Sequence, residues 1–374
     1  MTIEPERELE TVDIQINVGP QHPATHGVFR MVLTVSGEKI VDAVPHIGYL
    51  HRGAEKLSES MDYRQAMIYQ DRTEYLAQFN AEQCYCQAVE KLAGLEVPER
   101  AEYIRVILCE LNRIISHFMF VGAIATDLGV YGTVYIYAFR ERENIQALFE
   151  EVSGYRMMYG YFRPGGVVWD VPANFKERMQ TVLKQARVGI DDIDRLLTDN
   201  EIFISRCRGI GGISAEKAID YGLSGPMLRA CGVDFDLRRD EPYSIYDRFK
   251  FDVPTGTRGD VFDRYIVRME EMRQSIRIIE QALEQMPEGP IMPEKTPKKL
   301  RLPPGEVYMR TENPRGEYGV YLISKGGEKP YRLKIRSACF CNLTSLREIV
   351  IGHYMADDAA ILGSFDIILG EVDR

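Results

Sequence analysis

The chain has 374 residues, with 56 acidic and 46 basic side chains and a formal net charge of -10. Hydrophobic residues make up 45% and charged residues 27%, which is typical of a globular protein and excludes disordered and collagen-like classes. The acidic balance argues against nucleic acid as the main partner, because phosphate binding needs a basic surface. With 6 His and 7 Cys, the composition gives little sign of resident metal clusters.

The first 18 residues lack an apolar core segment, so they do not predict a secretory signal. The odd number of scattered cysteines predicts reduced thiols in a cytoplasmic compartment. Residues 114–126 form an uncharged run, but a membrane-spanning helix needs about 20 apolar residues. The run ends at Asp127, and we expect a buried core helix there.

Apolar periodicity predicts strands first, then helices, then strands again. The N-terminal strands are expected at 12–18, 28–35 and 40–45, and the helices at 58–92, 99–128, 137–154, 175–197 and 262–285. Six prolines between residues 287 and 304 indicate a linker, followed by strands at 306–310, 319–324 and 332–336 and a helix at 343–351. This segregation predicts an α+β fold with an N-terminal β region (1–53), a helical core (54–286), the linker (287–304) and a C-terminal β/α region (305–374).

The loop at residues 19–27, GPQHPATHG, is the most unusual local sequence. One interpretation is a tight turn built from Gly and Pro. A second is a metal pair made by His22 and His26, although Pro23 opposes the helix that this spacing needs. A third is a stiff loop that presents His26 as a proton donor, since imidazole titrates near pH 6.5.

The segment 71–75, DRTEY, falls inside the predicted helix 58–92, where Arg72 and Tyr75 would share one face. It is either a solvated helix face with local ion pairs or a functional surface. In the functional interpretation, Tyr75 donates its hydroxyl to a carbonyl ligand and Arg72 is a fixed cation.

Asp127 lies in the last turn of a predicted helix, where the helix dipole disfavours an anion. It either has a partner, for which histidine is a natural choice, or belongs to a plain helix end capped by Gly129.

The sequence also contains two Cys-x-Cys pairs, at 84/86 and 339/341. Neither has the CxxC spacing of zinc or iron–sulfur sites, so we expect unliganded thiols and no metal.

Eight stretches, in order from end to end, carry a family resemblance: GPQHPATHGVFR (19–30), PHIGYLHRGAEKLSE (45–59), 88–117, YAFRERE (137–143), 223–238, 259–276, 315–336 and GEVDR (370–374). Together they resemble the quinone-site subunit of respiratory complex I, the 49-kilodalton or D-subunit family of NADH-quinone oxidoreductases. That family is related to the large subunits of nickel–iron hydrogenases, so the resemblance implies a hydrogenase-large-subunit-like fold.

The resemblance implies an oxidoreductase and translocase subunit that is not active alone. In such complexes the 49-kilodalton subunit and its iron–sulfur neighbour, the B subunit, enclose the quinone head group, and that neighbour holds the terminal cluster. Quinone would be the substrate, NAD would be used elsewhere in the complex, and this chain would bind no metal. The C subunit and the membrane-arm H subunit would be further partners, on the cytoplasmic side of the cell membrane, with this chain peripheral.

By motif position, His26 and Tyr75 resemble the two donors to the quinone head group, with His22 in a supporting role. Asp127 resembles the acid that pairs with the histidine, and Arg72 the arginine beside the neighbour's cluster. The hypothesis is that proton donation leaves Asp127 without its cationic partner, and that this charge change drives proton pumping.

Two departures from the family keep the interpretation open. Met158 stands where many relatives carry a histidine near the cluster. The short linker 287–304 is typical of complexes that use menaquinone or lack the NADH-oxidising module, so ferredoxin or another donor is an alternative. A hydrogenase-like subunit without its metal site and a purely structural docking subunit are two rival interpretations; the missing CxxC motifs argue against hydrogenase activity.

Overall fold

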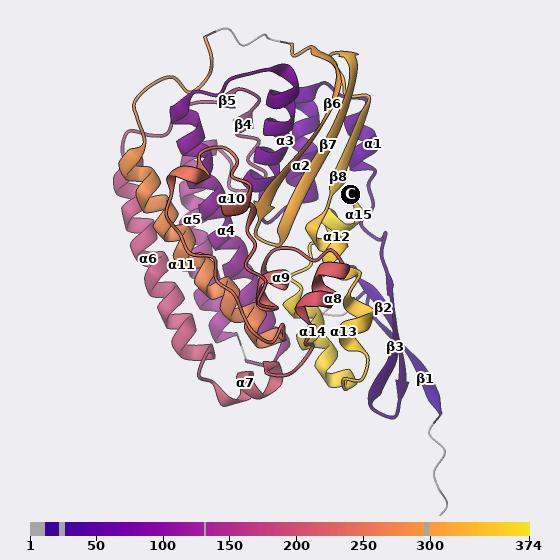
Figure 1. Ribbon diagram of the computed structural model, residues 1–374. Helices are drawn as coiled ribbons and strands as arrows, with labels where there is room; N and C mark the ends of the chain where they lie inside the picture. Colours follow the sequence, from indigo (N-terminus) through magenta and orange to yellow (C-terminus); the bar gives the residue numbers. More distant parts are fainter. Residues whose placement is uncertain (1–11, 22–26, 131, 295–298) are drawn as a thin grey trace, which may run out of the picture.

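A computed structural model describes residues 12–21, 27–130, 132–294 and 299–374. Long helices form the body of the molecule, a C-terminal sheet lies beside α2 and α3, and an N-terminal sheet projects from the opposite end (Figure 1). The order of strands, helices and strands confirms the predicted α+β class. The exact domain boundaries stay a prediction.

The N-terminal sheet is antiparallel, with the order β1(Asp13–Val18), β2(Arg30–Ser36) and β3(Lys39–His46), which confirms the three predicted strands. In β2 every second side chain is buried, because a strand alternates its faces. Backbone hydrogen bonds from Ile40 N to His353 O (2.9 Å) and from Gly352 N to Ile40 O (2.8 Å) attach this sheet to the C-terminal region.

Four long helices pack side by side in the body: α4(Glu99–Asp127), α5(Thr133–Ser153), α6(Phe175–Leu197) and α11(Val261–Gln285) (Figure 1). Among the described residues, α4 is the one helix long and apolar enough to cross a membrane. However, 89% of its most apolar window is buried inside the protein. This burial confirms the prediction of a buried core helix.

Buried ion pairs tie α4 to α11 and to the segments around them. Nε2 of His117 lies 2.8 Å from a Glu271 carboxylate oxygen, and the Arg229 guanidinium lies 2.7 Å from the other oxygen. Arg229 also pairs with Glu312 at 2.8 Å and with Asp236 at 3.5 Å. All five side chains are almost fully buried. Burial lowers the pKa of His117, and the charges of the other four side chains depend on one another.

The predicted helix 58–92 is wrong, because three helices occupy this region: α1(Ala54–Ser58), α2(Tyr63–Thr73) and α3(Gln78–Ala93). The side chain of Asp62 accepts hydrogen bonds from the amides of Arg64 and Gln65, which starts α2. The second break, at residues 74–77, carries Tyr75 and is described with the site below.

The C-terminal sheet is antiparallel, with the order β6(Leu302–Asn313), β7(Gly316–Gly327) and β8(Arg332–Arg336). Its first two strands are longer than predicted, and β6 begins inside the proline-rich segment. Pro303 and Pro304 are tolerated there because β6 is an edge strand, where a missing N–H need not break a ladder.

The predicted short helix at 343–351 corresponds to α13(Leu346–Val350), but the sequence analysis missed α12(Ala338–Leu343), which directly precedes it. Between them, the hydroxyls of Thr344 and Ser345 donate to the carbonyls of Cys341 (2.6 Å) and Asn342 (2.8 Å). Such side-chain bonds offer the backbone an alternative to a continuous helix. The chain closes with η3(Met355–Asp357), α14(Asp358–Ser364) and α15(Leu369–Asp373).

The other described elements are short. They are β4(Phe162–Arg163), β5(Gly166–Val167), α7(Glu201–Cys207), α8(Ala215–Asp220), α9(Pro226–Ala230), α10(Leu237–Asp240) and η2(Tyr246–Arg248).

Candidate quinone-binding site

Tyr75 and Asp127, which the sequence singles out separately, line the same cavity of about 280 Å³. We call it the Tyr75 cavity. It forms where the break between α2 and α3, the C-terminal end of α4 and the segment before α15 meet. Its lining residues are Gly27, Tyr75, Leu76, Met119, Phe120, Ala123, Asp127, Asp366, Ile367 and Ile368. The walls are therefore mostly apolar, with three side chains that can exchange protons.

The helix break at residues 74–77 places Tyr75 at the cavity, and Glu74 stabilises it. One carboxylate oxygen of Glu74 accepts hydrogen bonds from the amides of Leu76 (3.3 Å) and Ala77 (3.1 Å), which begin the next helix. The same oxygen lies 3.3 Å from the Arg315 guanidinium. Tyr75 therefore follows the end of α2, and the prediction that it shares a helix face with Arg72 is wrong.

Two amide side chains satisfy the other backbone groups that the break sets free. Asn112 of α4 donates from Nδ2 to the Leu76 carbonyl and accepts from the Phe79 amide, both at 2.9 Å. Gln78 donates from Nε2 to the Tyr75 carbonyl at 2.5 Å. Since unpaired buried backbone groups cost free energy, these bonds make the break a specified feature of the structure.

The surroundings of Tyr75 keep its phenol protonated. Burial raises the pKa of Tyr75 above its ordinary value, and the nearby Glu74 carboxylate adds to the increase. At neutral pH Tyr75 is therefore a neutral hydroxyl, which can donate a hydrogen bond or a proton to a carbonyl oxygen. Its ring packs against Gly370 of α15, where a Cβ would lie only 2.8 Å from the Tyr75 Cε1.

Asp127 is the last residue of α4, which confirms its predicted place in the last turn, although the helix ends one residue before the predicted end at 128. Gly129 follows with φ +76°, its amide donates to Thr126 O (3.0 Å), and the Val130 amide donates to Ala125 O (2.9 Å). This is a glycine-capped helix end of the Schellman type. Burial raises the pKa of Asp127 to about 7, because among the described residues no cation or donor compensates the charge. The predicted helix cap is confirmed, and the predicted histidine partner stays a prediction.

Asp366 is a cavity residue that the sequence reasoning missed. It is 4% exposed and has φ +56°, a left-handed conformation that is uncommon for a residue other than glycine. Arg315 donates to its carbonyl (2.9 Å) and to Oδ1 (3.2 Å), while Oδ2 has no hydrogen-bond partner among the described residues. The sequence around Asp366 does not predict its role, because that role depends on its backbone conformation and on Arg315, which is distant in the chain.

Arg72 does not line the Tyr75 cavity. It lines a separate cavity of about 210 Å³ together with two other arginines, Arg52 and Arg374. The Arg72 side chain is 43% exposed, and its guanidinium lies 3.7 Å from the buried Asp71 carboxylate. The half-exposed Arg72 side chain is available to a partner. That Arg72 lies beside the iron–sulfur cluster of the neighbouring subunit stays a prediction.

His22 and His26 lie outside the described residues, so their roles as donor and supporting residue stay predictions. Gly27, which directly follows His26, lines the Tyr75 cavity. The first described residue after His26 therefore lies in the wall of the Tyr75 cavity.

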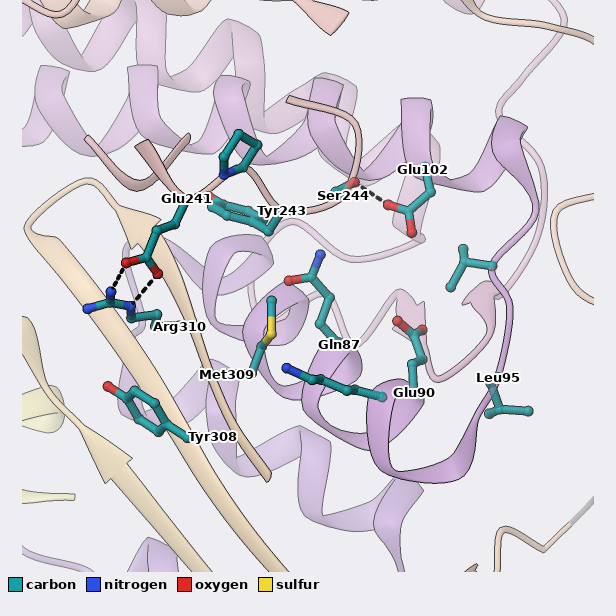
Figure 2. Close-up of a pocket in the computed structure, with 13 residues that line it drawn as sticks. Gln87, Glu90, Leu95, Glu102, Glu241, Tyr243, Ser244, Tyr308, Met309 and Arg310 are labelled. Atoms are coloured by element: carbon teal, nitrogen blue, oxygen red, sulfur yellow. Dashed lines mark hydrogen bonds and ion pairs between the residues drawn. The ribbon is translucent and has the colours of Figure 1, made fainter. Parts of the chain in front are cut away.

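A larger cavity, of about 590 Å³, lies elsewhere, between the end of α3, the Tyr243 loop and β6 (Figure 2). We call it the β6 cavity. Its acidic side chains already have partners: Glu90 pairs with Arg105 at 2.6 Å, and Glu241 pairs with Arg310. No site residue predicted from the sequence lines it. Size alone would select this cavity, whereas the chemistry selects the Tyr75 cavity.

The seven cysteines are free thiols, and six of them are buried. Throughout residues 12–21, 27–130, 132–294 and 299–374, no three His, Cys, Asp or Glu side chains gather in a group that could hold a metal ion. Met158 is half-buried and has a left-handed φ of +59°.

The sequence matches the family described as "Respiratory-chain NADH dehydrogenase, 49 Kd subunit" over residues 127–374. The chain belongs to this family. Proteins named as the D subunit of NADH-quinone oxidoreductase share about half of their residues with it. The one from Dehalococcoides mccartyi is 51% identical over 366 residues, covering 98% of this chain and 100% of that protein.

Two more of these D-subunit proteins show the same agreement. The one from Carboxydothermus hydrogenoformans is 50% identical over 365 residues, with 98% of this chain and 100% of that protein covered. The one from Desulforamulus reducens is 52% identical over 365 residues, with 98% and 99% covered. The resemblance to the 49-kilodalton subunit family is therefore confirmed along nearly the whole chain.

Proposed function

We propose that this chain is the quinone-binding core subunit of an NADH-quinone oxidoreductase and that the quinone head group binds in the Tyr75 cavity. The observation that carries the proposal is the convergence of Tyr75 and Asp127 on one largely apolar cavity. Its volume of about 280 Å³ is near the lower end of the ~300–1,000 Å³ of ligand pockets. A ring-sized head group fits this space, with the lipid tail outside.

In this proposal the side chains of this chain hold the ring and supply protons. Tyr75 donates a hydrogen bond to one quinone carbonyl oxygen, and His26 donates to the other, with His22 in support. The two electrons would come, one at a time, from an iron–sulfur cluster held by the neighbouring B subunit. As each oxygen gains negative charge, Tyr75 and His26 transfer their protons to it, and Asp127 loses its cationic partner. No metal bound by this chain takes part.

The proposal also places the chain in a complex. The iron–sulfur B subunit, the C subunit and the membrane-arm H subunit are its partners, on the cytoplasmic side of the cell membrane, with this chain peripheral. Large apolar side chains on and after α5 support a partner-covered surface there: Ile136 is 68% exposed, Tyr155 62% and Trp169 47%. NADH, with the NAD site elsewhere in the complex, is the donor in this proposal, and ferredoxin is the alternative.

Photolabelling of the assembled complex tests the proposed binding site. A short-chain quinone with a photoreactive group on its ring should label residues 119–127 or 366–368, and excess unlabelled quinone should prevent this. Competed labelling in the β6 cavity, for example at residues 241–244 or 308–310, would contradict the proposal. The same preparation, supplied with NADH or reduced ferredoxin, identifies the electron donor.

A further inference from the structure

Two fully buried arginines of α11, Arg264 and Arg268, have no acidic partner among the described residues. Buried charges are normally paired, because taking a charge out of water is costly. Five other arginines are buried to the same degree, and each of them lies 2.6–3.3 Å from a carboxylate oxygen: Arg105, Arg113, Arg229, Arg238 and Arg315. The two arginines of α11 therefore depart from the pattern of the rest of the core.

Arg268 is the less satisfied of the two. Its Nη1 donates to the Arg264 carbonyl at 3.1 Å, whereas Nε and Nη2 have no hydrogen-bond partner among the described residues. Arg264, by contrast, donates three hydrogen bonds of 2.6–2.8 Å, one to the Ser364 hydroxyl and two to backbone carbonyls. Burial lowers the pKa of Arg268 to about 10, so its guanidinium is still a cation at neutral pH.

The Arg268 guanidinium stacks on a side chain of the Tyr75 cavity. Its Cζ lies 4.1 Å from the centre of the Phe120 ring, within the range of a cation–π contact. Phe120 lines the cavity and Arg268 does not, so the ring separates the cation from the space proposed for the head group. A head group in contact with the other face of this ring would lie roughly 8 Å from the guanidinium, because carbon atoms in contact are about 3.5–4.0 Å apart.

The charged groups around Arg268 do not cancel its charge. The two carboxylates that act on it are Asp366 and Glu271, and the two cations are Arg315 and Arg229. Asp366 already pairs with Arg315 at 3.2 Å, and Glu271 with Arg229 at 2.7 Å. Each of these acids thus has a cation of its own, and Arg268 adds a positive charge behind the cavity wall.

We propose that Arg268 makes the Tyr75 cavity favour a negatively charged head group and thereby stabilises the quinone as it is reduced. The inference rests on the proposed function and adds a residue that lies behind the cavity wall. One electron from the neighbouring subunit's cluster converts the neutral quinone to a radical anion. A second electron and the protons of Tyr75 and His26 complete the reduction to quinol. A fixed cation behind Phe120 lowers the free energy of the charged state without any movement of the protein.

Binding of matched anionic and neutral rings tests the proposal. 2-Hydroxy-1,4-naphthoquinone is an anion at neutral pH, because its hydroxyl is a vinylogous acid, whereas 1,4-naphthoquinone has the same ring system and is neutral. Each compound competes with photolabelling of residues 119–127 in the oxidised, assembled complex without an electron donor. The wild type should bind the anion more tightly than the neutral ring.

Arg268→Gln removes the charge and leaves the wall residue Phe120 in place. At roughly 8 Å and an effective dielectric constant of about 20, Coulomb's law gives an effect of about 30-fold on the binding of an anion. Arg268→Gln should therefore weaken binding of the anion at least ~10-fold and change binding of the neutral ring less than about twofold. Arg268→Lys is the matched control, because it keeps the positive charge, and it should retain the preference for the anion.

Three results would overturn the inference. Equal weakening of both rings in Arg268→Gln would show a structural role alone, and unchanged binding of the anion would show that the charge does not reach the cavity. If Arg268→Gln does not assemble, the wild type decides, and tighter binding of the neutral ring than of the anion would be the contrary result. Failure of the proposed function is distinct, because neither ring would then prevent labelling of residues 119–127.

Discussion

Gly370 is the closest approach of α15 to Tyr75, so Gly370→Ala tests whether the position of the ring matters. The added Cβ would lie 2.8 Å from the Tyr75 Cε1 and 2.8 Å from the Thr73 carbonyl oxygen. Carbon atoms in contact are normally about 3.5–4.0 Å apart, so the ring or the helix must move by roughly 1 Å. The Thr73 oxygen belongs to the backbone, so it cannot rotate away as a side chain could.

The expected effect follows from this displacement. Overpacking of this kind costs about 1–3 kcal/mol of stability, which a large, well-packed subunit can tolerate. A displacement of roughly 1 Å in a positioned catalytic group can lower a rate by up to ~100-fold. We therefore expect the Gly370→Ala complex to assemble but to reduce quinone about 10- to 100-fold more slowly than the wild type.

The assay is NADH-driven reduction of a short-chain quinone, normalised to the amount of assembled complex. Gly212→Ala is the matched control, because the nearest atom to its added Cβ is 3.5 Å away and neither glycine has a left-handed φ. The control should retain wild-type activity. If Gly370→Ala assembled and retained activity within twofold of the wild type, the close packing of α15 would have no role in positioning Tyr75.

Three further variants test the site and its support. Burial raises the pKa of Asp127 from 3.8 to about 7, so stability is lost as the pH rises from about 4 to about 7, where only the unfolded state is ionised, and is level above that range. Asp127→Asn should remove this pH dependence from both stability and kcat, and lower kcat about tenfold. Asn112→Ala leaves the Leu76 carbonyl and the Phe79 amide unpaired, and each unpaired group should lower the free energy of unfolding by about 1–3 kcal/mol. Quinone reduction should fall as well. A thermal stability equal to that of the wild type would contradict the account of the break. Arg229→Met removes the guanidinium that three buried carboxylates share and should cost about 3–5 kcal/mol, seen as a lower temperature at which the complex dissociates. An unchanged temperature would mean that the remaining partners of these carboxylates, such as Arg238 beside Asp236, are sufficient.

The long elements could be predicted from the sequence because their apolar periodicity continues over several turns. The helix at 175–197 and the strand at 332–336 have the bounds that the sequence predicts, and α4 ends at Asp127, one residue before its predicted end. The break at 74–77 could not be predicted, because its sequence EYLA contains no Gly or Pro. The partners that specify it, Asn112 and Arg315, are distant in the chain.

The candidate site was predicted in part. Tyr75 and Asp127 were identified from their motifs, and the structure brings them to one cavity. Asp366 was missed, because its role depends on a left-handed backbone conformation and on an ion pair with Arg315, neither of which leaves a local pattern.

The central claim is that Tyr75 donates its hydroxyl proton to the quinone. Tyr75→Phe tests it most directly, because phenylalanine keeps the ring that packs against Gly370 and removes only the hydroxyl. The measurement is kcat for NADH-driven quinone reduction by the assembled complex, with an artificial acceptor that is reduced upstream as the control. A positioned proton donor contributes about 10²–10⁴-fold, so kcat should fall at least ~100-fold while reduction of the artificial acceptor stays unchanged. A wild-type kcat in this variant would contradict the account.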